Sequence, residues 1–367
     1  MRLLRSFIAY GVIVQLGLVT SVWLQGCAGQ PSEPNVLLAG NGTEPAALVF
    51  GVSEHRILSA LFEGLATMDP GSLEPEPAAA SRWEISDGGL VYRFYLDPDA
   101  RWSDGTPVKA EDFVYAWRRM LTPALGAEYA YMLHCLAGAR DFNEGRAADF
   151  SAVGARALSD DVLEVRLEHP TPYFLRMQSH FAWYPVKREA IEASGRMDDR
   201  NNPWARPGTL VSNGPFRLAV WQPNDQIRVE RNPFYRRADK VRLNAIVFYP
   251  VDNQQTEERL FRAGLLDMTS TIPRHKIPVY RQRMPDRLQS HPYLGTYFYR
   301  FNVTRPPLDD PRVRRALVMA LDRRELVDHV LKGGETPADR LVPDGMADYQ
   351  PPAGIPFDPE SARRLLS

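Results

Sequence analysis

The amino-terminal 27 residues constrain this chain most strongly, because they determine the compartment in which the remainder must fold. Two arginines in the opening MRLLRS precede an uncharged stretch from Phe7 to Leu24. A cationic region followed by an apolar region of this kind is typical of a secretory signal peptide. We therefore expect the rest of the chain to work outside the cytoplasm.

The segment LQGC, which ends at Cys27, resembles a bacterial lipobox, in which the cysteine is lipidated and becomes the new amino terminus. This interpretation predicts residues 1–27 as a lipoprotein signal peptide, a membrane lipid attached through Cys27, and residues 28–34 as a flexible linker. The apolar stretch is also long enough for an uncleaved transmembrane anchor, which remains the alternative. Either way, we expect a protein of the periplasm or cell exterior that is tethered to a bacterial membrane.

Charge and cysteine content exclude other classes of protein. The 367 residues include 44 basic and 45 acidic side chains, so the chain lacks the cationic excess that a general nucleic-acid binder needs. The length suggests two domains. If Cys27 carries lipid, Cys135 has no partner for a disulfide, and its apolar surroundings predict a small buried hydrophobe.

The spacing of apolar residues beyond Asn35 predicts a mixed α/β protein without a strict βαβ rhythm. Hairpin turns are expected at 86–89, at the SDD of 153–167 and at the QPND of 216–229. We expect strands at 35–41, 90–96, 243–249 and 293–303, and helices that follow Ser53 as N-cap, cover 113–121 and 253–263, and run from Asp310 to Ala320.

The sequence carries no catalytic or metal-binding motif that would support an exported enzyme. No two histidines have the spacing of a helical zinc site, and neither GxSxG nor a phosphate-binding glycine loop occurs. The acidic run from Asp97 to Gly105 fails the ligand spacing of a calcium loop. We therefore expect no enzyme, no metal and no cofactor. An exported lipid-anchored hydrolase remains the alternative of another class, because catalytic groups assemble in space.

Several segments, in a fixed order, resemble the peptide-binding members of the bacterial extracellular solute-binding proteins of family 5, which serve ATP-driven oligopeptide importers. The most specific are RWSDGTPVKAEDFVYAWRR (101–119) and PPLDDPRVRRALVMALDRRELV (306–327). Four others support them: LFEGLATMDP (61–70), VLEVRLEHPTPYFL (162–175), SNGPFRLAVWQPNDQIRVERNPFY (212–235) and the run 263–269. Most residues of these motifs are expected to maintain the domain shape rather than to contact ligand.

The resemblance implies a mixed α/β fold of the periplasmic-binding-protein class II type, a two-lobed clamp with an extra domain and discontinuous domains. It places residues 35–63 and 187–294 in lobe I, 64–186 in the extra domain, and 295–367 at the start of lobe II, which is incomplete here. The implied function is capture of oligopeptides and their delivery to the permease of an ABC importer, by a monomer. Dipeptide, nickel, haem or oligosaccharide binding by the same fold is the alternative.

The resemblance also indicates ligand-binding positions. The segment Phe50, Gly51, Val52 and Ser53 matches the part of the first lobe that runs beside the ligand backbone, which is bound as an added strand. Tyr129, Thr271, Tyr293 and Phe298 match positions that line the cleft. Each aromatic residue could instead belong to the core, and for Phe298 the core is the favoured interpretation.

Overall fold

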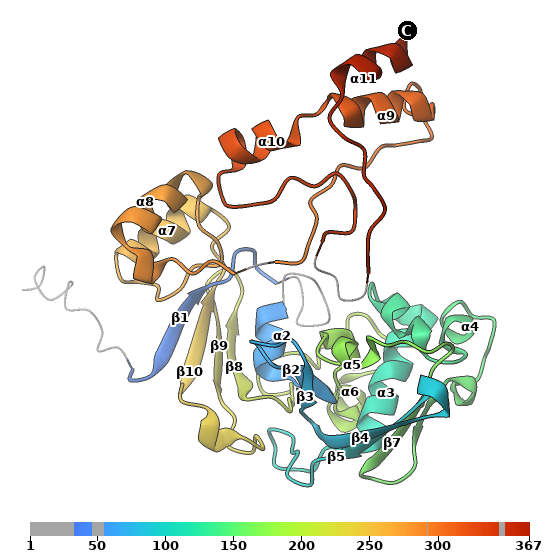
Figure 1. Ribbon diagram of the computed structural model, residues 1–367. Coiled ribbons are helices and arrows are strands. Elements are labelled where there is room, and N and C mark those ends of the chain that lie inside the picture. The colour runs from blue at the N-terminus through green and yellow to red at the C-terminus, as the bar shows by residue number, and fades with distance from the viewer. Residues whose placement is uncertain (1–32, 46–54, 292, 345–348) are drawn as a thin grey trace, which may run out of the picture. The chain divides into compact units, whose positions relative to one another are not determined.

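The computed structural model describes residues 33–45, 55–291, 293–344 and 349–367 (Figure 1). The chain divides into two compact units, with the boundary between Ser270 and Thr271. In the described part of the chain, no helix is long and apolar enough to cross a membrane.

The first unit contains a four-stranded sheet in the order β1-β10-β9-β8, in which β1 is parallel to β10 and the other neighbours are antiparallel. The register pairs Val36 with Ala245, so segments far apart in the sequence share one sheet. The strands are β1 (Val36–Gly40), β8 (Phe216–Gln222), β9 (Gln226–Arg231) and β10 (Ala245–Tyr249). The predicted strands at 35–41 and 243–249 and the predicted QPND hairpin are confirmed.

A second four-stranded sheet has the order β4-β5-β7-β6 and is antiparallel throughout. Alternate residues of β5, beginning at Tyr92, are buried, as expected for a strand with one face on the core. The predicted turn at 86–89 and the SDD hairpin are confirmed. The strands are β4 (Ala80–Ser86), β5 (Val91–Leu96), β6 (Ala155–Ala157) and β7 (Val162–Arg166), and a two-stranded ribbon pairs β2 (Ala66–Met68) with β3 (Pro75–Pro77).

Helices and short turns pack on these sheets around one apolar core. The largest side chains with almost no exposed surface include Trp102, Trp117, Trp183 and Trp204. The helices are α2 (His55–Leu61), α3 (Ala110–Leu121), α4 (Ala139–Asn143), α5 (Phe174–Met177), α6 (Arg188–Ser194) and α7 (Gln254–Arg262). The predicted helices that give α2, α3 and α7 are confirmed, whereas the proposed N-cap Ser53 lies outside the described residues. Cys135 is half-buried at the edge of this core, and burial raises the pKa of its thiol to about 12.

The regular elements described in the second unit are all helical. They are α8 (Ile277–Arg283), α9 (Pro311–Ala320), α10 (Arg323–Glu325), a π-helical turn (Leu326–Leu331), α11 (Pro359–Leu366) and two short 3₁₀ turns (Arg274–Lys276 and Pro285–Arg287). Helix α9 begins where the sequence predicts: the Asp310 carboxylate accepts the Arg312 backbone N–H at 2.8 Å, and Pro311 follows the cap. Ala316 and Met319 of α9 pack with Ala362 of α11.

The strand predicted at 293–303 is wrong. The described residues of this segment form no regular element, and no β-bridge joins them to another described segment. Tyr293, Tyr297 and Tyr299 are exposed, and Phe298 has 56% of its surface exposed, so its assignment to the core is wrong as well. Apolar alternation favours a strand only where a neighbouring strand accepts its hydrogen bonds.

Candidate ligand-binding site

Tyr129, a predicted site residue, belongs to an aromatic cluster of the first unit. It precedes the 3₁₀ turn η5 (Ala130–Cys135), and its ring centroid lies 5.1 Å from that of Phe181 and 5.2 Å from that of His180. Tyr131, which is 61% exposed, lies 6.0 Å from Tyr129 on the solvent side. The ring of His55, the first residue of α2, meets Phe181 edge-on at 6.2 Å. Three segments distant in the sequence thus present aromatic rings together.

His180 gives this cluster a polar group without charge. Its Nδ1 accepts the backbone N–H of Ala182 at 3.1 Å, so the neutral ring carries its proton on Nε2. Burial, and then the neighbouring His55, lower the pKa of His180 to about 4. At neutral pH the cluster therefore offers ring faces and edges, but no cation from His180.

The other predicted site residues are distributed differently. Phe50, Gly51, Val52 and Ser53 lie outside the described residues, as does Cys27. Thr271, Tyr293 and Phe298 belong to the second unit, where all three are exposed and lie outside regular elements. The sequence reasoning missed His55, His180 and Phe181, because nothing local in the sequence links them to Tyr129.

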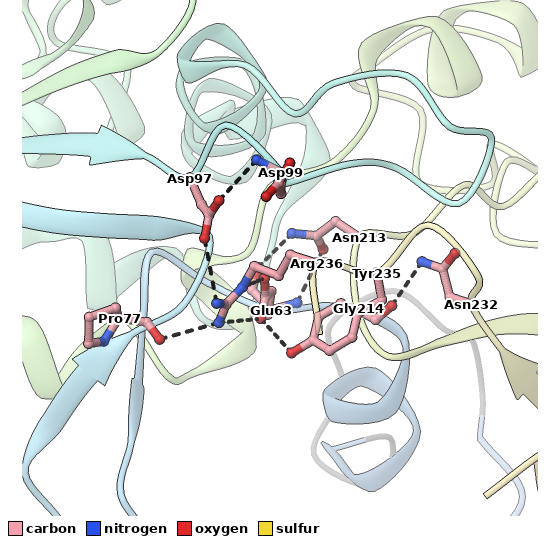
Figure 2. Close-up of polar contacts among 9 residues, drawn as sticks. All are labelled: Glu63, Pro77, Asp97, Asp99, Asn213, Gly214, Asn232, Tyr235 and Arg236. Atoms are coloured by element: carbon pink, nitrogen blue, oxygen red, sulfur yellow. Dashed lines mark hydrogen bonds and ion pairs between the residues drawn. The ribbon is translucent and has the colours of Figure 1, made fainter. Parts of the chain in front are cut away.

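Two of the resemblance motifs, through Glu63 and Tyr235, meet at a buried polar network in the first unit (Figure 2). Arg236 lies between Glu63 and Asp97: its Nε donates to Glu63 Oε1 at 2.8 Å, and its Nη1 lies 3.7 Å from Asp97 Oδ2. The Tyr235 hydroxyl donates to Glu63 Oε2 at 3.0 Å, and Arg236 Nη2 donates to the Pro77 carbonyl at 3.3 Å. Only 6% of the Arg236 side chain and 12% of the Glu63 side chain are exposed.

Burial and pairing act on these charges in opposite directions. Burial raises the pKa of Glu63, and the hydrogen bond and charge of Arg236 oppose that rise. Burial alone would lower the pKa of Arg236, but the Glu63 carboxylate raises it overall. Breaking the pair would leave a buried charge without compensation, so the network should hold the two motif segments together.

Close backbone contacts explain the SNGP and LFEG motifs. The Asn213 side chain bonds both backbone groups of Glu63, accepting its N–H at 3.1 Å and donating to its carbonyl at 2.9 Å. A Cβ on Gly214 would lie 2.6 Å from the carbonyl carbon of Leu61, so only glycine fits there. Ser103, from the SDG motif, donates its backbone N–H to the Ser212 carbonyl at 2.7 Å. These residues maintain the fold, as the sequence analysis expected.

The described residues contain no cluster of three or more histidine, cysteine or acidic side chains that could hold a metal ion.

Comparison with known proteins identifies the family. The family model of bacterial extracellular solute-binding proteins, family 5, matches residues 74–367. The periplasmic oligopeptide-binding protein OppA of Escherichia coli is 35% identical over 359 residues, which cover 95% of this chain and 64% of that protein. The probable deoxycholate-binding periplasmic protein YgiS of Escherichia coli is 38% identical over 290 residues, which cover 78% of this chain and 52% of that protein.

Solved structures agree with the sequence matches. The Escherichia coli murein tripeptide binding protein MppA has a TM-score of 0.82 at 31% identity, covering 91% of this chain and 65% of that one. Haemophilus influenzae OppA in complex with the peptide RPPGFSPFR has a TM-score of 0.77 at 31% identity, covering 86% of this chain and 61% of that one. The chain therefore spans less than two thirds of the length of each of these four proteins.

The chain belongs to family 5 of the bacterial extracellular solute-binding proteins. The predicted fold class is confirmed: a mixed α/β protein with several sheets, whose solved neighbours are clamp proteins of this family. The relatives named above are binding proteins.

Proposed function

We propose that this protein is an extracytoplasmic solute-binding lipoprotein that captures oligopeptides and delivers them to the permease of an ABC importer. The similarity to an oligopeptide-binding protein along 95% of the chain carries this proposal. It assigns the protein no catalytic step, metal or cofactor, and it places the protein, as a monomer, outside the cytoplasm with a lipid anchor on Cys27.

The aromatic cluster suits a ligand whose side chains vary. A peptide bound as an added strand gains affinity from main-chain hydrogen bonds that every peptide can make. Aromatic faces add contact area that does not depend on a particular side-chain charge. The Tyr129 ring, with the uncharged His180 beside it, would provide such a surface against one side chain of the peptide.

A discontinuous lobe is part of the proposal. We infer that residues 35–63 and 187–294 form lobe I, that residues 64–186 form the extra domain and that 295–367 begin lobe II. The parallel pairing of β1 with β10 supports the first assignment, because it joins the two segments in one sheet. The antiparallel sheet β4-β5-β7-β6 supports the second, because all of its strands lie between 64 and 186.

Bile-acid binding is the second candidate function. YgiS, which is described as a probable deoxycholate-binding protein, shares 38% identity with this chain. The apolar ring system of a bile acid could also pack on the faces of Tyr129 and Phe181. The two candidates differ in what they require: a peptide needs main-chain partners along its length, whereas a steroid needs mainly apolar surface.

Calorimetric titration of the protein with trialanine, RPPGFSPFR and deoxycholate separates these functions. We expect both peptides to bind, and Tyr129→Ala to weaken their binding by about tenfold, or ~1.4 kcal/mol, through the lost ring contacts. Tyr173→Ala is the control, because Tyr173 is an exposed tyrosine of the same unit that takes part in none of the ring pairs of the cluster. Binding of deoxycholate and of neither peptide would overturn the proposal in favour of the second candidate.

A further inference from the structure

Arg119 is a buried cation without a countercharge. It lies on α3 with 2% of its surface exposed, and its side chain makes no hydrogen bond or ion pair with any described residue. Its Nε is shielded from solvent and has no partner. Burial lowers the pKa of Arg119, and Tyr115 is the one group that opposes this shift.

Arg236 shows how the same unit treats another buried arginine. Its guanidinium lies against the carboxylates of Glu63 and Asp97. For Arg119, by contrast, no carboxylate oxygen of the described residues lies within 4.0 Å of a side-chain nitrogen. An uncompensated buried charge is strongly unfavourable, so the cation at Arg119 calls for an anion that the described residues do not supply.

Two more hydrogen-bond donors that lack a hydrogen-bond partner among the described residues lie beside Arg119. Tyr115 precedes it by one helical turn on the same face of α3, is 5% exposed, and has a buried hydroxyl without a partner. Trp204 is 1% exposed; its ring centroid lies 5.7 Å from Arg119 Cζ, and its Nε1 is also buried without a partner. Arginine and tryptophan can donate hydrogen bonds but cannot accept them.

Charged groups from α6 surround this cluster without neutralising it. Glu192 accepts from Arg188 Nε at 2.9 Å, so its charge is already paired. Burial, and then the charge of Glu192 and the contact of the hydroxyl with that carboxylate, raise the pKa of Tyr115 to about 12, so the phenol keeps its proton and remains a donor. A hollow of about 340 Å³ is lined in part by Tyr115, Arg188 and Glu192, and it reaches the cluster at Tyr115 only, because Arg119 and Trp204 do not line it.

We propose that Arg119, Tyr115 and Trp204 form a buried binding site for a small monovalent anion of the halide class, with chloride as the physiological occupant. A water molecule is the weaker alternative, because its two hydrogens need acceptors and this site provides mainly donors. An anion accepts from all three groups and compensates the guanidinium charge. The site is separate from the Tyr129 cluster and does not depend on the proposed transport function.

Thermal unfolding in chloride and in gluconate at equal ionic strength tests the proposal. The midpoint of wild-type unfolding should rise with chloride concentration, as mass action requires for a ligand of the folded state. Arg119→Met keeps the shape of the side chain and removes its charge, so it should abolish this rise. Arg156→Met, at an exposed arginine on β6 in the same unit, should retain it. Equal chloride dependence in the wild type and Arg119→Met, or none in the wild type, would overturn the proposal.

Anomalous scattering from crystals grown in bromide provides a second readout that does not require a variant to fold. A bromide peak within hydrogen-bonding distance of Arg119 Nε supports the site. Ordinary water density at this position, or no density, contradicts it. Trp204→Phe removes one donor with little change in shape and should lower the bromide occupancy by about half.

Discussion

The ion pair between Glu63 and Arg236 should be a main support of the first unit. Arg236→Met removes the cation and leaves the Glu63 carboxylate, whose side chain is 12% exposed, with only the Tyr235 hydroxyl among its side-chain donors. Removing one partner of a buried pair typically costs about 3–5 kcal/mol, because the remaining charge stays buried. We therefore expect Arg236→Met to lower the free energy of unfolding of the first unit by this amount. Such a loss is about a third or more of the stability of an ordinary domain.

The double variant Glu63→Leu with Arg236→Met tests the physical reason. With both charges gone, Glu63 no longer leaves a buried carboxylate uncompensated, and apolar side chains of similar size fill the space. Asp97 also loses its contact with Arg236, but its side chain is 23% exposed and can be solvated instead. The double variant should lie within about 2 kcal/mol of the wild type and above the single Arg236→Met variant. A double-mutant cycle then gives the coupling free energy directly.

Urea unfolding followed by tryptophan fluorescence is a suitable assay, because several buried tryptophans lie in this unit. Lys240→Met is the control: the Lys240–Asp239 pair is 77% and 71% exposed, so its loss should change the unfolding free energy by less than about 1 kcal/mol. If Arg236→Met lowers the unfolding free energy no more than Lys240→Met does, the Glu63–Arg236 pair contributes no more than an exposed ion pair, which contradicts the prediction.

The folded-state pKa of His180, about 4, lies below its ordinary value of 6.5, so the unfolded chain takes up this proton first as the pH falls. The free energy of unfolding should therefore drop by about 1–2 kcal/mol between about pH 6.5 and 4, after allowance for partial exposure. His180→Phe should remove that part of the pH dependence. If the variant keeps the pH profile of the wild type, the lowered pKa does not belong to His180. Gly214→Ala should lower the unfolding free energy by about 2 kcal/mol or more through the clash with Leu61, whereas Gly71→Ala, whose new Cβ meets nothing closer than 3.4 Å, should be close to neutral; equal effects would refute the packing argument. Cys27→Ala should abolish palmitate labelling in cells, and continued labelling would exclude this cysteine as the lipidated residue.

Elements with local signals were predictable from the sequence. The Asp87–Gly89 turn, the α3 stripe with acidic residues in its first turn, and the Asp310 cap all depend on residues that are neighbours in the chain. Within such short segments, local hydrogen bonds and the spacing of residue types are compatible with few other backbone conformations. The prediction at 293–303 was wrong because a strand depends on a partner elsewhere, and apolar alternation does not reveal whether a partner is present.

The candidate site was predictable only in part, because its members come from distant segments. The family resemblance indicated Tyr129, but His55 and His180 gain their significance because each packs against Phe181. The same limitation applies to Glu63 and Arg236, whose charges look ordinary in the sequence. Arg119 lies within a motif segment and reads there as a solvated helical arginine, and only its burial in the folded unit distinguishes it.

Native mass spectrometry of the protein purified from its own cells tests the central claim most directly. If the protein binds oligopeptides, we predict a ladder of co-purifying masses that match short peptides of varied sequence, and added RPPGFSPFR should displace these peptides. A single co-purifying mass matching a bile acid, or turnover of added peptides into fragments, would contradict it.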